Sequence, residues 1–286
     1  MDSSIESKIR KIYQDKLHRD ADQSGLKFFH DKIKTGIIKM ENLETIIEQS
    51  DEYKKLNENL RHKIKTNDLY DKQTFIIMKK ILKIDSNCID VGAHKGHILK
   101  KIVELCPKGS HLAFEPIPEF YNNLKRDFPQ VKIFDYALSN QEGESTFYFV
   151  KDAPAYSGLK QRDYDIENPK IIPIVVKTQT LDSILEKNPL RIDFIKIDVE
   201  GAEGFVIQGG MKSIKKNRPF IVFEFGKRSS GFYDITPERF FDFFSKSKLK
   251  ISLLADWIDN KDSLTLDGFK KNYHDSLNYY FLAHPD

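Results

Sequence analysis

The sequence predicts an α/β domain, with an open and mostly parallel β-sheet covered by helices on both faces, behind a small all-helical domain. Two observations lead to this prediction. From about residue 66 onward, short apolar runs with strand character alternate with segments of helical periodicity. Residues 1 to about 65 show helical periodicity throughout. We therefore expect a helical domain over residues 1–65 and an α/β domain over residues 66–286.

The N-terminal region is expected to form four helices. Apolar residues recur at helical spacing in three of them, and the polar stretch HRDADQSG separates the first two. The stripes are Ile5, Ile9, Ile12 and Tyr13, then Leu26, Phe29 and Ile33, then Leu43, Ile46 and Ile47. The fourth helix begins at the capping sequence of residues 50–53, and a separate helix is expected near residues 70–83.

The rest of the chain alternates between expected strands and helices. The expected strands are NCIDVGA, HLAFEP, VKIFDYAL, ESTFYFV, RIDFIKIDV, PFIVFEF, ISLLADWI and LNYYFLAHP. The expected helices are HILKKIVELC, FYNNLKRDF, LDSILEK, FVIQGGMKSIKK and PERFFDFFSKS. The last of these carries phenylalanines at helical spacing, which favours a place in the core.

The composition is that of an ordinary globular protein, with 40% hydrophobic and 31% charged residues. The formal net charge of +3 is too small to indicate nucleic-acid binding, and we expect none. Cys88 and Cys106 are expected to be reduced core thiols. No apolar run is long enough to span a bilayer and the N-terminus lacks a signal core, so a cytoplasmic location is expected.

The first expected strand ends in a glycine-containing loop that is a candidate binding site. Ligands bind beyond the carboxyl ends of the strands in open parallel sheets. Here the strand runs through Asp90 into Gly92, Ala93, His94 and Gly96. The G-x-x-x-G spacing departs from the G-x-G-x-x-G pattern of dinucleotide-binding loops. The preceding acid suits a ligand with a positive group, such as the ammonium of an amino acid.

The next two strand ends add features of a nucleoside site. Glu115 ends the second strand, where a carboxylate can accept both hydroxyls of a ribose. After the third, Ala137 and Leu138 could flank an adenine ring, with Asp135 or a nearby backbone group at its edge. The loop, the acid and the apolar wall occur in order on consecutive strands, and their combination is more specific than any one of them.

Several segments together resemble the FkbM-type S-adenosylmethionine-dependent methyltransferases over residues 70–286. They are CIDVGAHKG, AFEP, DYALSNQEGEST, TLDSIL, DFIKIDVEGAE and FIVFEF. The resemblance implies a class I methyltransferase (Rossmann-like) fold, with S-adenosylmethionine as methyl donor and S-adenosylhomocysteine as product. It also implies O-methylation of a small-molecule or glycan acceptor, namely a hydroxyl of a sugar, glycan or natural product. The Phe-rich C-terminal part matches no substrate class.

The N-terminal region resembles the phycobilisome-linker-like helical repeat through IYQDKLHRDADQSGLKFFHDKIKTG and EQSDEY. The residues that carry this resemblance are Tyr13, Leu17, Arg19, Ala21, Asp22, Gly25, Leu26, Gly36 and Ser50. It implies a docking module that engages a protein partner or a second copy of the chain, and it implies no chemistry.

The segment DFIKIDVEGAE supplies the candidate catalytic acids. Alternation along an extended strand would place Lys196, Asp198 and Glu200 on the face toward the ligand crevice. A carboxylate that takes the proton of a hydroxyl would help methyl transfer. Either Asp198 or Glu200 could be that base, and Asp198 could instead hold the amino-acid end of the donor. Glu224 ends a neighbouring strand and is expected to face the same crevice as a substrate ligand or second acid.

Other readings of these residues stay open. Lys196 and Glu203 are candidate acceptor contacts, but Lys196 could simply neutralise Asp198, and Glu203 could be a favourable acid at a helix start. The three acids Asp198, Glu200 and Glu224 could also bind a metal ion, although methyl transfer needs none, and we expect no metal. Residues 152–159 could cover the acceptor, with Tyr156 and Ser157 contacting it, or form an ordinary surface loop.

Two other functions compete with the methyltransferase. One is a nicotinamide-dependent oxidoreductase, which the missing G-x-G-x-x-G pattern disfavours. The other is an inactive methyltransferase-fold scaffold whose helical module engages a partner. The acids retained at three strand ends disfavour that second alternative.

Overall fold

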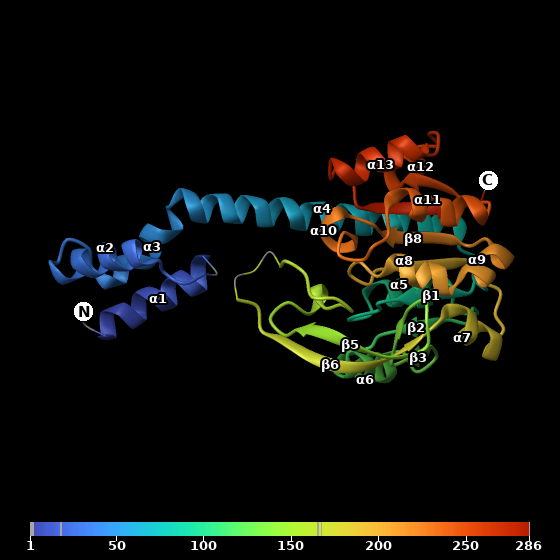
Figure 1. Ribbon diagram of the computed structural model, residues 1–286, viewed down its shortest axis with the longest axis horizontal. Helices are drawn as coiled ribbons and strands as arrows, with labels where there is room; N and C mark the ends of the chain where they lie inside the picture. Colours follow the sequence, from blue (N-terminus) through green and yellow to red (C-terminus); the bar gives the residue numbers. More distant parts are fainter. Residues whose placement is uncertain (1–2, 18, 165, 167, 286) are drawn as a thin grey trace. The chain divides into compact units, whose positions relative to one another are not determined.

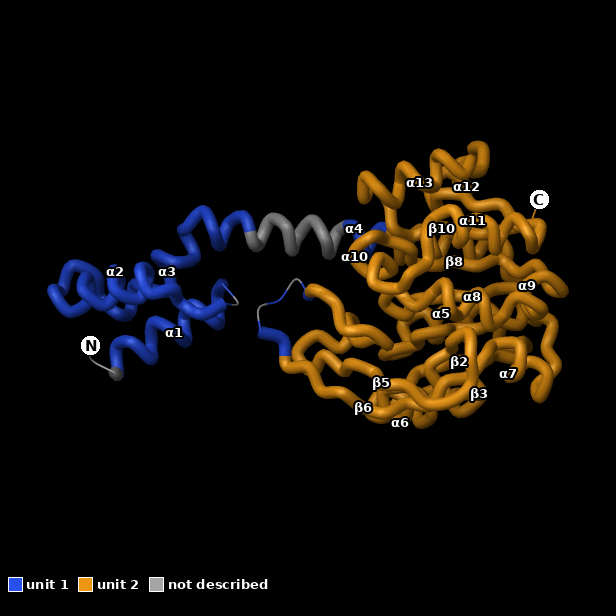
Figure 2. The backbone as a smooth tube through the Cα atoms, in the orientation of Figure 1, with its two compact units in different colours: residues 1–69, 164–169 blue, residues 70–163, 170–286 orange. Residues whose placement is uncertain are grey.

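The computed structural model describes the backbone of residues 3–17, 19–164, 166 and 168–285, and their side chains except at residues 3 and 56–65. The chain divides into two compact units (Figure 2). One contains residues 1–69 and 164–169, and the other contains residues 70–163 and 170–286.

The smaller unit contains helices around a core of its own. They are α1 (Ser3–Leu17), α2 (Gln23–Lys34), the 3₁₀ turn η1 (Met40–Asn42), α3 (Leu43–Glu48) and the beginning of α4 (Asp51–Ile81). The side chains of Ile9 and Leu43 are fully buried, together with Leu26 and Ile47 of the expected stripes. The two helices expected near residues 50 and 70–83 are one continuous helix, α4. The reason is that no glycine or proline interrupts residues 51–81.

The main sheet of the larger unit has the strand order β3-β2-β1-β7-β8-β10-β9. Figure 1 labels β3, β2, β1 and β8 of this sheet. Its parallel part contains β3 (Lys132–Phe134), β2 (Leu112–Phe114), β1 (Cys88–Val91), β7 (Phe194–Ile197) and β8 (Phe220–Glu224). β10 (Tyr280–His284) lies antiparallel between β8 and β9 (Lys250–Leu253). The mostly parallel sheet is therefore confirmed.

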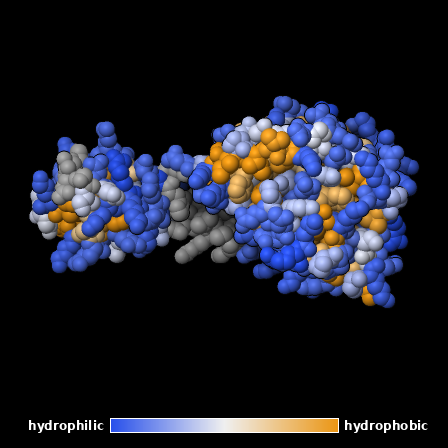
Figure 3. All heavy atoms as spheres, turned by 90° about the horizontal axis from the view of Figure 1, so that it is seen from below, coloured by the Kyte–Doolittle hydropathy of each residue, from blue (hydrophilic) through white to orange (hydrophobic). Residues whose placement is uncertain are grey.

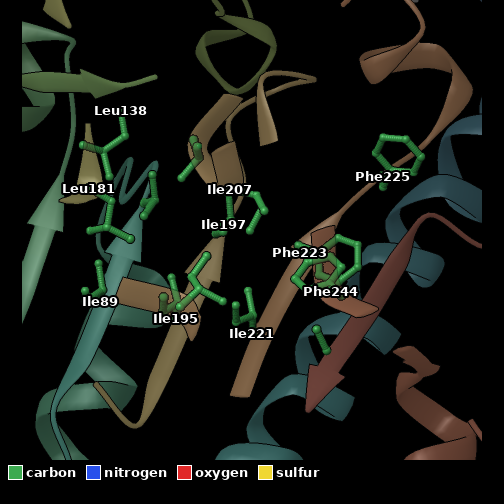
Figure 4. Close-up of a cluster of buried hydrophobic side chains, with 14 of the residues drawn as sticks. Ile89, Leu138, Leu181, Ile195, Ile197, Ile207, Ile221, Phe223, Phe225 and Phe244 are labelled. Atoms are coloured by element: carbon green, nitrogen blue, oxygen red, sulfur yellow. The ribbon is translucent and has the colours of Figure 1, made fainter. Parts of the chain in front are cut away.

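Alternate strand residues pack on opposite faces of this sheet, and helices cover both faces. Ile89, Ile195, Ile197, Ile221 and Phe223 point into one apolar cluster (Figure 4). This cluster is closed by α7 (Leu181–Lys187), α8 (Glu203–Gly209), α9 (Met211–Asn217), α11 (Pro237–Lys246) and α13 (Leu266–His274). Cys88, Phe194, Val222 and Leu282 point into the other cluster, which α4, α5 (His97–Leu105) and α12 (Leu254–Ile258) close.

A second sheet, with the order β4-β6-β5, was not predicted. Its strands are β4 (Tyr136–Leu138), β5 (Gly143–Val150) and β6 (Ile171–Gln179). VKIFDYAL is therefore not one strand, because β3 pairs with β2 while β4 pairs with β6. β6 contains Pro173, which lacks a backbone N–H, but β4 pairs only with residues 177–179 of β6, so no β4 residue is opposite Pro173.

Some other element boundaries differ from the prediction. Residues 205–216 form two helices that meet at Gly210, and only the first residues of ISLLADWI are a strand before α12 begins. α10 (Lys227–Ser230) and α13 were not predicted, whereas α6 (Pro118–Asp127) was. Phe240 and Phe244 are fully buried in the core, as expected.

Cys88 and Cys106 are both buried and carry free thiols.

The surface of the chain is largely hydrophilic on the face seen in Figure 3, with smaller apolar areas between the polar ones. This agrees with a composition in which 31% of the residues are charged. Within the described part of the chain, no helix combines the length and apolar character needed to cross a bilayer.

Candidate active site

A cavity of about 150 Å³ opens where the parallel strands of the larger unit end. Most of its wall comes from the ends of β1, β2, β4 and β7 and from the segment that follows β5. Eight of the residues singled out from the sequence line it: Gly92, His94, Glu115, Ala137, Leu138, Ser157, Asp198 and Glu200. The other predicted site residues lie beside or behind this wall.

Gly92 brings the loop after β1 against the turn after β7. Its backbone has φ +81°, and a Cβ atom there would lie 1.9 Å from the carbonyl oxygen of Asp198. Its N–H donates to the carbonyl of Phe114, as does that of Ala93. Ala93 and Gly96 do not line the cavity. Ala93 is buried in a small apolar cluster, and Gly96 begins α5 against Phe128, so these two residues shape the loop.

Asp90 lies within β1, is 2% exposed and does not line the cavity, although the next residue of the strand, Val91, does. Its carboxyl accepts a hydrogen bond from the backbone of Leu99 in α5, while Oδ2 is buried and finds no partner among the described residues. Burial raises the pKa of Asp90 to about 7. Its expected contact with the donor stays a prediction.

Glu115 lines the cavity with a carboxylate that two backbone groups hold in place. Oε2 accepts from the N–H of His94 at 2.8 Å and Oε1 from the N–H of Ile117 at 2.9 Å. Burial raises its pKa to about 7. Each carboxylate oxygen has a second lone pair, so Glu115 keeps the capacity to accept two hydroxyl groups of a ligand.

The apolar part of the wall is built around Ala137 and Leu138 of β4, with Phe114, Tyr136 and Phe147 beside them. Asp135 does not line the cavity. It is the residue at which the chain passes from β3 in one sheet to β4 in the other, and its side chain is half-buried outside the wall. The imidazole of His94 lines the cavity edge-on to Phe120, and its Nε2 is buried without a partner in the described part of the chain.

Asp198 lies at the floor of the cavity and is engaged by two donors. Its Oδ2 lies 3.0 Å from Nζ of Lys196 and accepts the hydroxyl of Tyr280. Burial opposes ionisation of Asp198, but Lys196 and Tyr280 outweigh it and hold its pKa below the usual range. Lys196 is buried and does not line the cavity, and its ammonium contacts Asp198.

Glu200 also lines the cavity, but its pKa is shifted in the opposite direction from that of Asp198. Its Oε2 forms an ion pair with Arg162. Burial raises the pKa of Glu200 to about 8, against the opposing effect of Arg162 and with a further contribution from Asp198. The two acids that face the cavity therefore differ, because Asp198 is held ionised while Glu200 takes up a proton near neutral pH.

Glu224, the last residue of β8, lies close to these two acids but does not line the cavity itself. Burial, followed by repulsion from Glu200 and Asp198, raises its pKa well above the usual value. Its Oε1 accepts from Oγ of Ser229 at 3.0 Å, and it shares a hydrogen bond with Asp198. Glu224 therefore supports Asp198, and its role as a substrate ligand or second acid stays a prediction.

A turn, and not strand alternation, brings Asp198 and Glu200 together. β7 ends at Ile197, and Glu200 and Gly201 have φ +57° and φ +108°, so the chain is no longer extended there. Glu203 closes this turn, because its Oε1 accepts from the N–H groups of Val199 and Gly201. Glu203 is fully buried, which contradicts its expected contact with the acceptor.

Oxygen atoms of Asp198, Glu200 and Glu224 lie within 4.8 Å of one another, as the ligands of a divalent cation would. Lys196 and Arg162, however, already place two positive charges against two of these three carboxylates.

The segment after β5 forms the remaining wall through Pro154, Ala155, Ser157 and Leu159. Ser157 is buried, and its Oγ accepts from the N–H of Val150 at 3.0 Å. Tyr156 does not line the cavity, and its ring lies under the guanidinium of Arg162 at 5.4 Å. Its expected contact with the acceptor stays a prediction.

Arg162 and Tyr280 were not predicted as site residues. Tyr280 reaches Asp198 because β10 pairs antiparallel with β8, with Tyr280 opposite Glu224. Arg162 follows the wall segment, far from Glu200 in sequence. Neither residue stands in a local pattern that would have marked it, because both contacts depend on long-range pairing.

Comparison with known proteins gives two family matches. The model described as "Methyltransferase FkbM domain" matches residues 90–247, and "Domain of unknown function (DUF4214)" matches residues 2–57. The expected resemblance of the N-terminal region to phycobilisome linkers finds no support in these matches.

The chain is also similar to individual proteins. It is 27% identical over 163 residues to the 2-O-methyltransferase NoeI of Sinorhizobium fredii, which covers 52% of this chain and 67% of NoeI. It is 33% identical over 85 residues to the AMB antimetabolite synthetase AmbE of Pseudomonas aeruginosa, covering 28% of this chain and 4% of AmbE. Among solved structures, an FkbM methyltransferase from Methylobacillus flagellatus superposes with a TM-score of 0.43 at 14% identity, covering 71% of this chain and 44% of that one.

Proposed function

The chain belongs to the FkbM methyltransferase family, and from this premise we propose that it transfers the methyl group of S-adenosylmethionine to an acceptor hydroxyl. The acceptor that we propose is a sugar, a glycan or a hydroxylated natural product. The observation that carries the proposal is the cavity at the strand ends. It has Glu115 and an apolar wall on one side and the acids Asp198 and Glu200 on its floor.

The residues of the cavity fit the donor. Glu115 has free lone pairs for the ribose hydroxyls, and Ala137 and Leu138 supply an apolar surface for the adenine. Nε2 of His94 is a buried polar atom without a partner among the described residues, and a bound ligand could satisfy it. S-adenosylmethionine, when bound, supplies an activated methyl group, and S-adenosylhomocysteine is the product.

Glu200 is the best candidate for the base that accepts the hydroxyl proton. Asp198 already accepts from Lys196 and Tyr280, and its pKa is low, so it is a weak base. Glu200 lines the cavity, and its raised pKa makes its ionised form a stronger base. Because a protonated Glu200 cannot accept a proton, the rate of methyl transfer should rise as the pH increases toward about 8.

The hydrogen-bonding capacity of the floor also bears on the acceptor. The carboxylates of Asp198 and Glu200 can accept hydrogen bonds from hydroxyl groups, whereas an ionised phosphate or carboxylate has no proton to donate to them. A hydroxyl-rich, uncharged acceptor is therefore favoured over an anionic one.

The roles of the helical unit and the cellular location stay predictions. We propose a cytoplasmic enzyme in which residues 1–69 engage a protein partner or a second copy of the chain. Phe28 and Ile37 of this unit are 53% and 66% exposed, so apolar surface is available for such contacts.

The first test is calorimetric titration of the full chain with S-adenosylmethionine and S-adenosylhomocysteine, with NADH as control. We expect saturable binding of the first two ligands alone.

A panel of methyl glycosides is then tested for uptake of labelled methyl groups. Glu200→Gln should keep donor binding and lose at least about a hundredfold in rate. The exposed Glu142→Gln is the matched control. Absence of donor binding would contradict the proposal, and donor binding without uptake into any acceptor would favour the scaffold alternative.

A further inference from the structure

The segment from Pro154 to Arg162 is a fixed part of the cavity and not a free surface loop. Gly158 pairs with Tyr148 of β5 through both of its backbone groups. On the other side, the N–H of Lys160 donates to the hydroxyl of Tyr233 at 3.0 Å, and its ammonium donates to the carbonyl of Phe232 at 2.7 Å. The segment is therefore anchored between β5 and residues 232–233.

Arg162, at the end of this segment, points back to the cavity floor. One of its terminal nitrogens donates to Oε2 of Glu200, and its guanidinium lies on the ring of Tyr156. Only 7% of the Arg162 side chain is exposed. Nε is buried and has no hydrogen-bond partner in the described part of the chain.

Such an arrangement contributes little to stability. Removing a guanidinium and a carboxylate from water is costly, and their attraction often only offsets that cost. The buried Nε–H adds a further penalty because it donates to nothing. A buried ion pair with an unsatisfied donor at the edge of a cavity therefore points to a role in the site.

The anchored segment also packs directly on Glu200. A Cβ atom at Gly158 would lie 3.6 Å from both Cβ and the carbonyl oxygen of Glu200. The other charged groups that act on Glu200 are acids, namely Asp198 after β7, Glu203 of α8 and Glu224 of β8. Arg162 is the cation that the structure pairs with Glu200 on this side.

We propose that Arg162 is a positioning residue, which orients the carboxylate of Glu200 toward the acceptor and favours the ionised form that accepts a proton. The inference rests on the proposed function, because it assigns Glu200 the role of base. In this proposal, the segment from Pro154 to Arg162 has two roles. It forms part of the cavity wall, and through Arg162 it holds the proposed base, Glu200.

The test compares Arg162→Gln, Arg162→Lys and the exposed control Arg126→Gln in the full chain. For Arg162→Gln we expect unchanged donor binding, a fall in kcat of about tenfold or more at pH 7.5, and a smaller change in KM. The rising limb of the pH profile should move to higher pH, because the variant lacks the charge that favours ionised Glu200. In Arg162→Lys the rising limb should lie between that of the parent and that of Arg162→Gln. A parental pH profile in Arg162→Gln, or an equal loss at every pH together with weakened donor binding, would overturn the inference.

A second measurement needs no acceptor. The side-chain carboxyl of Glu200 is followed by ¹³C NMR during a pH titration and is assigned by its loss in Glu200→Gln. In Arg162→Gln its midpoint should move upward, whereas Arg126→Gln should leave it unchanged. An unmoved midpoint overturns the inference whatever the activity assays show. A moved midpoint in a chain that binds donor but methylates no acceptor supports the coupling of Arg162 to Glu200 and instead contradicts the proposed function.

Discussion

Glu115 shows how a single buried acid can report on donor binding. Without bound donor, the carboxyl of Glu115 has a pKa of about 7, because the effect of burial outweighs that of its two backbone hydrogen bonds. Donor hydroxyls would add hydrogen bonds that favour the ionised form, and so would lower this pKa in the complex. Donor binding should therefore release a proton near neutral pH.

Donor affinity should accordingly rise with pH across pH 6–8, with a slope of up to about tenfold per pH unit below 7. Glu115→Gln should weaken binding by about tenfold to a hundredfold and remove this slope. Calorimetry at several pH values measures both effects, and the exposed Glu119→Gln is the control. An affinity and slope like those of the parent in Glu115→Gln would show that Glu115 does not hold the ribose.

Whether the carboxylates of Asp198, Glu200 and Glu224 bind a metal ion can be tested by removing metal ions from the protein. Lys196 and Arg162 already neutralise two of the carboxylates, so we expect methyl uptake and donor affinity to be unchanged after exhaustive dialysis against EDTA. EDTA saturated with Mg²⁺ beforehand is the control. A loss of activity that Mg²⁺ or Mn²⁺ restores would instead place a cation among Asp198, Glu200 and Glu224.

The contact between the loop after β1 and the turn after β7 determines the shape of the cavity at the scale of elements. Gly92→Ala should push these two segments apart, because its Cβ would meet the carbonyl oxygen of Asp198, a backbone atom that cannot rotate away. We expect a loss of about 2–5 kcal/mol in the free energy of unfolding, from overpacking and from the positive φ.

Gly143→Ala is the matched control for Gly92→Ala. It also has a positive φ, +145°, but its Cβ would meet nothing closer than 4.0 Å, so only about 1–3 kcal/mol, from backbone strain, should be lost. Chemical denaturation of both variants and calorimetry with S-adenosylhomocysteine check the comparison. Equal losses in the two variants would mean that the close approach of β1 and β7 does not matter for stability.

For the whole molecule, the division into two units predicts two separate unfolding transitions. Each unit has a core of its own, with Ile9 and Leu43 in the smaller one. Leu43→Ala should lower only the transition of the smaller unit, by about 2–5 kcal/mol. S-adenosylhomocysteine at about 100 times its Kd should stabilise only the larger unit, by about 2.7 kcal/mol. Differential scanning calorimetry measures both, and a single transition that responds to both changes would contradict the prediction.

The sequence by itself determined the mostly parallel sheet, the order of its strands along the chain, most of the helices between them, and the acids at the strand ends. These features are local: apolar periodicity follows from which face is buried, and a glycine or an acid at a strand end can be read without knowing its neighbours. For the same reason Glu115, Asp198 and Glu200 were found.

Only the tertiary structure decided what depends on pairing between distant segments. The second sheet divides VKIFDYAL and places Asp135 outside the cavity, and β10 brings Tyr280 to Asp198. The fold likewise buries Glu203 beneath its turn and brings Arg162 to Glu200. Charge states follow from this packing, because burial and neighbouring charges give adjacent carboxylates of the same ordinary acidity opposite pKa shifts.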